Sequence, residues 1–275
     1  MSELVHVDRR GQVLEITLDR PPVNAITNEI SLALHAALQT LQDDDDLRVG
    51  IITGTGDRIF SAGWDLKEVA KARDASEVAA DSLETPGGFA GICEYWALKK
   101  PLIAALNGHA VGGGLEIAIA CDVIIAADHA EFFLPEMQRG FLPDAGAVKH
   151  LGRLIPVKVA VEMMLTGRHM SAQEAQGWGL VHDVAPAADL MGRARQMAEQ
   201  IASGAPLTLQ ALKEVLYPML SVPLPEAFAM SRRAISTKTP GTGPFPIYER
   251  MLASDDFLEG ARAFADKREP EFKGS

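Results

Sequence analysis

The sequence predicts an α/β fold, and two patterns together with the chain length carry that prediction. Short apolar runs, typical of buried strands, alternate with amphipathic helical patterns over the first two thirds of the chain. The last third has helical patterns with no strand between them. A chain of 275 residues, 47% hydrophobic and 23% charged, is long enough to bury a large core without disulfides. We therefore expect parallel sheets packed against helices, followed by a helical region.

The first expected elements are strands and one long helix. Thr27–Leu41 repeats its apolar residues with helical spacing, and Thr27 or Asn28 suits the N-cap. The acidic run Asp43–Asp46 should end this helix in solvent. The segments with strand patterns are Val13–Leu18, Arg48–Thr53, Pro101–Leu106 and Val123–Ala126.

Beyond about Val184 the pattern predicts helices alone. The expected helices are Ala187–Ile201, Leu207–Leu220, Pro225–Ile235 and Asp255–Lys267. We place a boundary between Ser203 and Gly204. Residues 1–203 then form the core, and residues 204–275 form a helical module.

Composition excludes several classes of function. The net charge is −11, which argues against nucleic acid or an anionic membrane as a partner. No apolar run approaches the ~20 residues of a membrane span, and the N-terminal residues lack a signal pattern. Cys93 and Cys121 lie in apolar surroundings without C-x-x-C spacing, and the seven histidines form no H-x-x-x-H pair. We expect a cytoplasmic protein with reduced thiols and no metal site.

Three loops carry candidate chemistry. Gly54–Lys67 contains small residues that permit close approach to a ligand, although an ordinary strand-to-helix loop explains it equally well. Asn107–Glu116 places three glycines before a helix, where free N–H groups suit an anion or a developing oxyanion. It lacks the spacing of a P-loop or a dinucleotide-binding motif.

Two glutamates in these loops are candidates for acid–base work. Glu116 lies among apolar residues, and burial would raise its pKa, although a carboxylate in a first helical turn also simply complements the helix dipole. Glu136 opens the third loop, within Glu131–Ala147, and in isolation it is most simply a solvated carboxylate.

Together, the loops resemble the crotonase (enoyl-CoA hydratase/isomerase) superfamily. The residues that carry the resemblance are Phe60–Leu66, Pro101, Asn107–Gly108, Gly112–Gly114, Glu116, Leu134–Glu136, Gly140 and Pro143. The resemblance implies a crotonase-like spiral of ββα turns, and a helical C-terminal region that builds trimers or hexamers. It also implies an acyl-coenzyme A substrate. Coenzyme A is part of that substrate, and no separate cofactor is expected.

The resemblance also assigns roles within the site. The backbone N–H groups of Trp64 and Gly113 would form an oxyanion hole for the thioester oxygen. Hydratases of this superfamily carry glutamates at the positions of Glu116 and Glu136, whereas isomerases and hydrolases often keep only one. The residues expected at coenzyme A are Ala62, Asp65, Leu66, Lys67 and Gly112, with Phe264 and Lys267 reaching a neighbouring subunit. Arg58 and Arg268 are further basic candidates, and each basic residue is equally an ordinary surface charge.

A narrower resemblance, to carnitinyl-CoA dehydratases within that superfamily, comes from three stretches. These are Ser61–Lys67, Gly87–Gly91 and Leu142–Gly146. A trimethylammonium substrate would favour an aromatic wall and a carboxylate. The acyl-pocket candidates are Phe89, Phe141 and Asp144, with Trp64, Tyr95 and Trp96 as further aromatics, although Tyr95 and Trp96 also suit core packing. Ala147 stands where most of the superfamily has glycine.

Three hypotheses follow from the sequence. A hydratase or dehydratase requires Glu116 and Glu136 to face one pocket, close to the N–H groups of Trp64 and Gly113. The Δ3,Δ2-isomerase and the thioester hydrolase need only one glutamate. A non-enzymatic RNA-binding role needs a basic stripe interleaved with aromatics, which the acidic composition disfavours.

Overall fold

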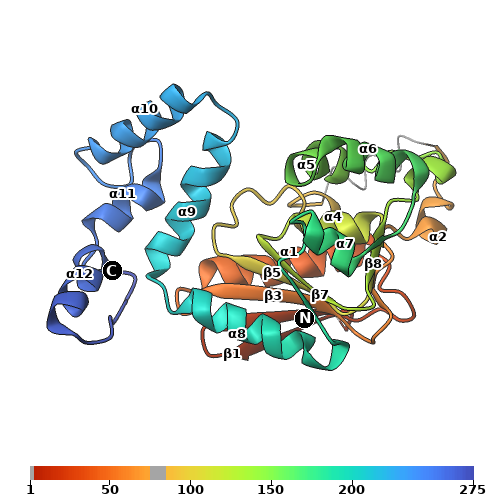
Figure 1. The fold of residues 1–275 in the computed structure, drawn as a ribbon, viewed down its shortest axis with the longest axis horizontal. Coiled ribbons are helices and arrows are strands. Elements are labelled where there is room, and N and C mark those ends of the chain that lie inside the picture. Colours follow the sequence, from red (N-terminus) through yellow and green to blue (C-terminus); the bar gives the residue numbers. More distant parts are fainter. Residues whose placement is uncertain (1–2, 75–84) are drawn as a thin grey trace.

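The larger sheet confirms the predicted α/β class. The structure, a computed structural model, describes residues 3–74 and 85–275 (Figure 1). In these residues the larger sheet has the order β1-β2-β3-β5-β7-β10. Its strands are β1 (Val5–Arg10), β2 (Val13–Leu18), β3 (Val49–Gly54), β5 (Leu102–Leu106), β7 (Val123–Ala127) and β10 (Asp183–Ala185). β1 and β2 pair antiparallel and the other pairs are parallel, so all four strands expected from the sequence lie here.

Helix α1 (Asn28–Asp43) forms where its apolar spacing predicted. The Thr27 side chain caps it by accepting a hydrogen bond from the N–H of Ile30, so Thr27 is the N-cap. The helix buries the predicted face, Ile30, Leu34, Leu38 and Leu41. It ends inside the acidic run, at Asp43, and Asp44 is its C-cap.

The central strands of the larger sheet bury both faces because their side chains alternate between two cores. Alternate residues of β3, Val49 and Ile51, face helix α8 (Leu190–Ala202). Ile52 of the same strand lies in the main core, with the apolar face of α1. A strand buried on both faces reads as a continuous apolar run, which explains why these strands were visible in the sequence.

A second, smaller sheet positions the loops, and the sequence did not predict it. Its order is β4 (Ile59–Ser61), β6 (His109–Val111), β8 (Glu131–Phe133) and β9 (Met170–Ser171). β4, β6 and β8 run parallel, whereas β9 is antiparallel to β8. Since parallel strands end at the same edge of a sheet, the three loops that follow β4, β6 and β8 emerge side by side.

The remaining core helices cover the smaller sheet and its loops. They are α2 (Leu66–Val69), α4 (Gly113–Ile119), α5 (Ala147–Leu154), α6 (Val157–Thr166) and α7 (Ala172–Gly177). Single 3₁₀ turns occupy Phe89–Gly91, Glu136–Arg139 and Ala187–Asp189. The sequence did not predict α5, α6 or α7 as separate elements.

The C-terminal helices stand beside the sheets rather than over them (Figure 1). They are α9 (Pro206–Met219), α10 (Leu224–Ile235), α11 (Pro246–Ala253) and α12 (Asp256–Asp266). The boundary expected between Ser203 and Gly204 falls in the turn that joins α8 to α9. Asp122 ties α9 to the core, because its carboxylate accepts hydrogen bonds from Lys213 Nζ and Tyr217 Oη, each at 2.7 Å.

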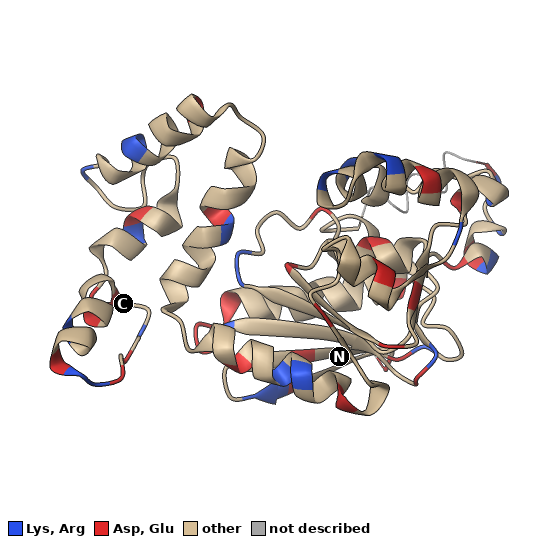
Figure 2. Ribbon diagram, in the orientation of Figure 1, with Lys and Arg blue, Asp and Glu red and all other residues tan. Residues whose placement is uncertain are grey.

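Positively and negatively charged residues do not gather in separate regions of the molecule. Figure 2 shows Lys and Arg intermixed with Asp and Glu along the helices. None of the helices in residues 3–74 and 85–275 is long and apolar enough to cross a membrane. Those same residues contain no cluster of His, Cys, Asp or Glu suited to a metal ion.

Candidate active site

The first two loops touch at two glycines. A Cβ built on Gly63 would lie 2.6 Å from the backbone N of Gly113 and 2.8 Å from the carbonyl oxygen of Val111. Gly63 also has φ +74°, a conformation that L side chains rarely adopt. The contact follows from the sheet, because Ser61 of β4 pairs with Ala110 of β6 immediately before the two loops.

The close approach brings the two predicted oxyanion donors together. The peptide N of Trp64 is bonded to Gly63, and Gly63 lies against the N of Gly113. Gly113 begins α4, where a helix supplies no acceptor for its own N–H groups. Within the described residues, we find no acceptor for either N–H among the loop and side-chain hydrogen bonds. Two such donors can stabilise negative charge on a thioester oxygen.

Glu116 lies one turn into α4 and is 4% exposed. Its Oε1 accepts hydrogen bonds from the backbone N of Gly146 at 2.7 Å and of Ala147 at 3.0 Å. Burial raises the pKa of Glu116 to about 7, against the lowering effect of these two bonds. The negative charges of Glu136 and Asp144 raise this pKa further.

The bonds to Glu116 also settle the effect of alanine at position 147. Ala147 is fully buried at the start of α5 and donates through its backbone N–H, which alanine supplies as well as glycine does. Loss of the glycine therefore leaves this contact intact.

Glu136 points toward the glycine loop rather than toward solvent. A Cβ built on Gly112 would lie 2.4 Å from Glu136 Oε1, so the carboxylate packs against the backbone of Gly112. Glu136 Oε2 is buried and has no hydrogen-bond partner among the described residues. Burial also raises the pKa of Glu136. A buried acceptor without a protein partner is costly, which marks this position as one where a ligand or a water would bind.

The two carboxyl groups form one electrostatic unit. Glu116 lies one helical turn from Gly112, and Glu136 packs against that same residue. Burial holds both pKa values up, and the charge of Glu136 adds to the shift at Glu116. Such a pair can supply a proton and accept one near neutral pH, which is the requirement of general acid–base catalysis.

The aromatic candidates for the acyl pocket surround the oxyanion donors. The rings of Trp64 and Phe141 meet edge to face, with centroids 6.0 Å apart. The Phe89 ring packs against Gly113, since a Cβ there would lie 2.5 Å from Phe89 Cζ. Trp64 and Phe89 line a pocket that opens to solvent. Phe141 and Asp144 do not line this pocket, and Asp144 is exposed.

Tyr95 and Trp96 lie away from the pocket. The Tyr95 ring meets His35 edge to face at 4.6 Å and packs against the main core. Trp96 is 68% exposed. Neither residue lines the pocket that Trp64 and Phe89 form, so the structure places neither in the aromatic wall.

The candidate coenzyme A residues divide into two groups. Ala62, Leu66 and Lys67 lie on the first loop and α2, and Lys67 is exposed. The carboxylate of Asp65, in contrast, is buried in contacts that hold the loop. It accepts hydrogen bonds from Arg20 at 2.6 Å and from the backbone N of Lys67 at 2.9 Å.

The second group, Phe264 and Lys267, lies far from the first group within one chain. α12, which carries Phe264 and is capped by Lys267, lies at the opposite end of the molecule from α2 (Figure 1). Phe264 is 88% exposed. Arg268 pairs with Glu259 at 2.6 Å, and Arg58 is exposed within the segment Gly54–Lys67.

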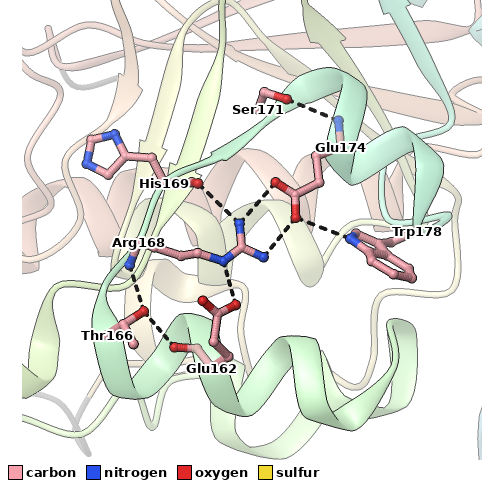
Figure 3. A network of polar contacts seen from close by, with 7 residues as sticks. All are labelled: Glu162, Thr166, Arg168, His169, Ser171, Glu174 and Trp178. Atoms are coloured by element: carbon pink, nitrogen blue, oxygen red, sulfur yellow. Dashed lines mark hydrogen bonds and ion pairs between the residues drawn. The ribbon is translucent and has the colours of Figure 1, made fainter.

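An ion-pair network centred on Arg168 joins α6 and α7 (Figure 3). Arg168 bonds to Glu162 of α6 and Glu174 of α7, which joins the two helices across β9. Gln138, two residues after Glu136, donates to the carbonyl oxygen of Thr166 at 2.6 Å. This bond holds the 3₁₀ turn that carries Glu136 against the end of α6. No sequence pattern indicated the ion-pair network, because its members are isolated charges in helices that were not predicted.

We expect the substitution Glu116→Gln to stabilise the protein at alkaline pH. Gln keeps an oxygen for the N–H groups of Gly146 and Ala147 but removes the buried charge. The pKa of Glu116 rises on folding from 4.5 to about 7. Hence the unfolded chain releases its proton at lower pH than the folded protein, and wild-type stability falls as pH rises between these values.

The loss for the wild type amounts to about 3 kcal/mol once the pH exceeds the folded pKa. Thermal unfolding should show a higher midpoint for Glu116→Gln than for wild type at about pH 8, and a small difference at about pH 5. An equal difference at both pH values would contradict a raised pKa at Glu116.

Comparison with known proteins agrees with the fold and with the loops over the full chain. The family model for enoyl-CoA hydratase/isomerase matches residues 8–275. A carnitinyl-CoA dehydratase from Salmonella agona is 46% identical over 274 residues, which cover 100% of both chains.

Solved structures give the same result. An enoyl-CoA hydratase from Bacillus anthracis superposes with a TM-score of 0.86 at 34% identity, over 99% of this chain and 100% of that one. An enoyl-CoA hydratase from Mycobacterium tuberculosis H37Rv has a TM-score of 0.86 at 33% identity over 100% of both chains.

Proposed function

The chain belongs to the enoyl-CoA hydratase/isomerase family, and from this premise we propose that it is a hydro-lyase acting on an acyl-coenzyme A thioester. It adds water across the α,β double bond of the acyl group, or removes it. The acyl group we propose is that of crotonobetainyl-CoA, with carnitinyl-CoA as the hydrated form.

The observation that carries this proposal is the pair of carboxyl groups beside the glycine loop, of which Glu116 is buried and Glu136 is half-buried with a buried Oε2. Glu136 packs against Gly112, Glu116 lies one turn further along, and both pKa values are raised. An isomerase or a thioester hydrolase needs only one of the two. A second buried carboxylate that had no chemical task would be costly to keep, because burial penalises its charge.

The proposed reaction uses groups of the chain itself. The thioester oxygen binds to the N–H groups of Trp64 and Gly113, which stabilise its negative charge as the reaction proceeds. Glu116 and Glu136 hold a water molecule at the β-carbon and take one of its protons as its oxygen bonds to that carbon. The pair then supplies a proton to the α-carbon, and dehydration follows the reverse course. Proton transfer and oxyanion binding need no cofactor other than the coenzyme A of the substrate.

Two observations support the choice of acyl group. Relatives that are 46% identical over the full chain are carnitinyl-CoA dehydratases. The pocket beside the oxyanion donors has the aromatic walls Trp64 and Phe89, which can pack on a trimethylammonium group.

Loss of absorbance at the enoyl-thioester band, measured with crotonobetainyl-CoA and crotonyl-CoA in parallel, tests the proposal. We expect faster loss with crotonobetainyl-CoA. Faster loss with crotonyl-CoA would keep the hydratase chemistry and replace the acyl group by that of a short-chain fatty-acid intermediate. Absence of loss with either thioester would contradict a hydro-lyase that acts on these two acyl groups.

We propose further that the protein is a homotrimer or a dimer of trimers in the cytoplasm. The C-terminal helices expose large apolar side chains that solvent would not favour, among them Leu220 at 71%, Leu224 at 74% and Phe264 at 88%. Apolar surface of this kind is typical of an oligomer interface.

Light scattering after gel filtration should therefore give three or six times the chain mass of 29.5 kDa. The variant Leu220→Asp should shift the protein toward smaller species, since it places a charge in the apolar contact. A monomeric wild-type protein would contradict the proposal.

A further inference from the structure

The pocket beside Trp64 and Phe89 contains a carboxylate that the sequence did not single out. Glu68 of α2 lines this pocket. The other described residues that line it are aromatic, aliphatic or neutral polar. Among the described residues that line the pocket, Glu68 is therefore the charged residue that a ligand would contact.

The polar groups on the floor of the pocket are already engaged. Thr85 Oγ1 donates to Asn28 Oδ1 at 2.8 Å, and Ser31 Oγ donates to the carbonyl oxygen of Thr27 at 3.0 Å. Thr27 caps α1. These hydrogen bonds fix the side chains of the floor, none of which carries a formal charge.

The floor also creates a need for negative charge if a cation is to bind. Thr27, Asn28 and Ser31 belong to the N-terminal turn of α1, and this turn faces the pocket. A helix N-terminus carries partial positive charge, which repels a cation. A trimethylammonium group would therefore require both an aromatic face and a nearby carboxylate.

Glu68 is free to serve as that carboxylate. Its partner is Lys71, with Nζ and Oε1 2.8 Å apart, and the side chains are 70% and 51% exposed for Lys71 and Glu68 respectively. Such an exposed pair is weak and exchanges readily with solvent. Lys71 does not line the pocket. A cation bound in the pocket can therefore replace the Lys71 ammonium group as the partner of Glu68.

We propose that Glu68 is the counter-charge for the trimethylammonium end of the substrate and so determines specificity for a cationic acyl group. This inference rests on the proposed function. Asp144, the carboxylate expected from the sequence, is exposed outside the pocket, and its charge instead raises the pKa of Glu116. The same charge on Glu68 disfavours acyl groups that end in a carboxylate.

The test compares two substrates of one shape. Crotonobetainyl-CoA carries a trimethylammonium group, and 5,5-dimethylhex-2-enoyl-CoA carries a neutral tert-butyl group in its place. The ratio of kcat/KM for the cationic over the neutral thioester measures the contribution of charge. In Glu68→Gln we expect this ratio to fall by about 5- to 30-fold, mostly through loss of activity toward the cationic substrate.

Three further variants sharpen the test. Lys71→Gln frees Glu68 from its partner, so the ratio should rise above the wild-type value. Glu199→Gln removes one exposed negative charge on α8, remote from the pocket, and should leave the ratio unchanged. A wild-type ratio in Glu68→Gln, or a loss of charge preference in Asp144→Asn with Glu68 intact, would overturn the assignment.

Different results would contradict the role of Glu68 and the proposed function. If the wild type hydrates crotonobetainyl-CoA but Glu68→Gln keeps the ratio, only the role of Glu68 is wrong. If neither thioester is hydrated, the proposed function is wrong, and the ratio of the two dissociation constants in the same variants still tests Glu68. An unchanged ratio of dissociation constants would then overturn its role as well.

Discussion

Replacement of either Glu116 or Glu136 by glutamine should reduce the rate of hydration by about 10²- to 10⁴-fold, the range that general acid–base groups contribute. Gln matches Glu in shape and keeps an oxygen that accepts hydrogen bonds. In Glu116→Gln the bonds from the N–H groups of Gly146 and Ala147 persist. The loss in rate therefore measures proton transfer rather than collapse of the site.

The two variants should resemble each other because the carboxyl groups act on one water molecule. Removal of either leaves the remaining group without its partner, so the double variant should lose little more than each single variant. The pH profile of kcat should also change. The wild type should show limbs on both sides of neutral pH, and each variant should lose one of them.

Glu199→Gln serves as the control here also, since it makes the same chemical change at an exposed position on α8. Circular dichroism should show native folding in all three proteins. If one glutamate variant kept more than about a tenth of the wild-type rate, the two-carboxylate mechanism would be wrong. A single-glutamate reaction such as double-bond isomerisation would then fit the site better.

The parts of the fold that the sequence predicted are those with a strong hydrophobic period. β3 and β5 are buried on both faces, and α1 buries one continuous stripe, so each leaves a clear pattern. The amphipathic C-terminal helices were visible for the same reason. α11 was not, because the Pro- and Gly-containing segment before it hides its start.

The smaller sheet escaped prediction because its strands are too short to show a period. β4, β6 and β8 have three residues each and are joined by long crossovers. Their motifs nonetheless marked the loops that follow them, so Trp64, Gly113, Glu116 and Glu136 were identified while the reason for their proximity was not. That reason is the parallel pairing of the three strands.

Contacts between distant residues lay beyond any pattern in one sequence. The hydrogen bonds from Gly146 and Ala147 to Glu116 join backbone groups that carry no side-chain signal. Glu68 looks like any exposed helical glutamate paired at i+3, and its place in the pocket depends on how α1 and α2 meet. For Asp65, the sequence could not distinguish a ligand of coenzyme A from the partner of Arg20 that the structure displays.

Gly63→Ala should lower kcat/KM by about 10²- to 10³-fold, the effect of losing an oxyanion-hole donor. The new Cβ would lie 2.6 Å from the N of Gly113 and 2.8 Å from the carbonyl oxygen of Val111. Both neighbours are backbone atoms, so they can yield only if one of the two loops moves. Any such movement separates the N–H of Gly113 from that of Trp64, and both are needed at one thioester oxygen.

Alanine at position 63 also imposes backbone strain. The variant Gly56→Ala measures the effect of this strain alone. Gly56 lies in the turn between β3 and β4 with φ +82°, against +74° for Gly63, but a Cβ there meets nothing within 4 Å. Both variants should therefore lose about 1–2 kcal/mol of stability from the left-handed conformation. Only Gly63→Ala should lose the larger factor in kcat/KM. Equal activity in the two variants would mean that the contact between Gly63 and Gly113 does not set the position of the oxyanion donors, because strain is the one effect they share.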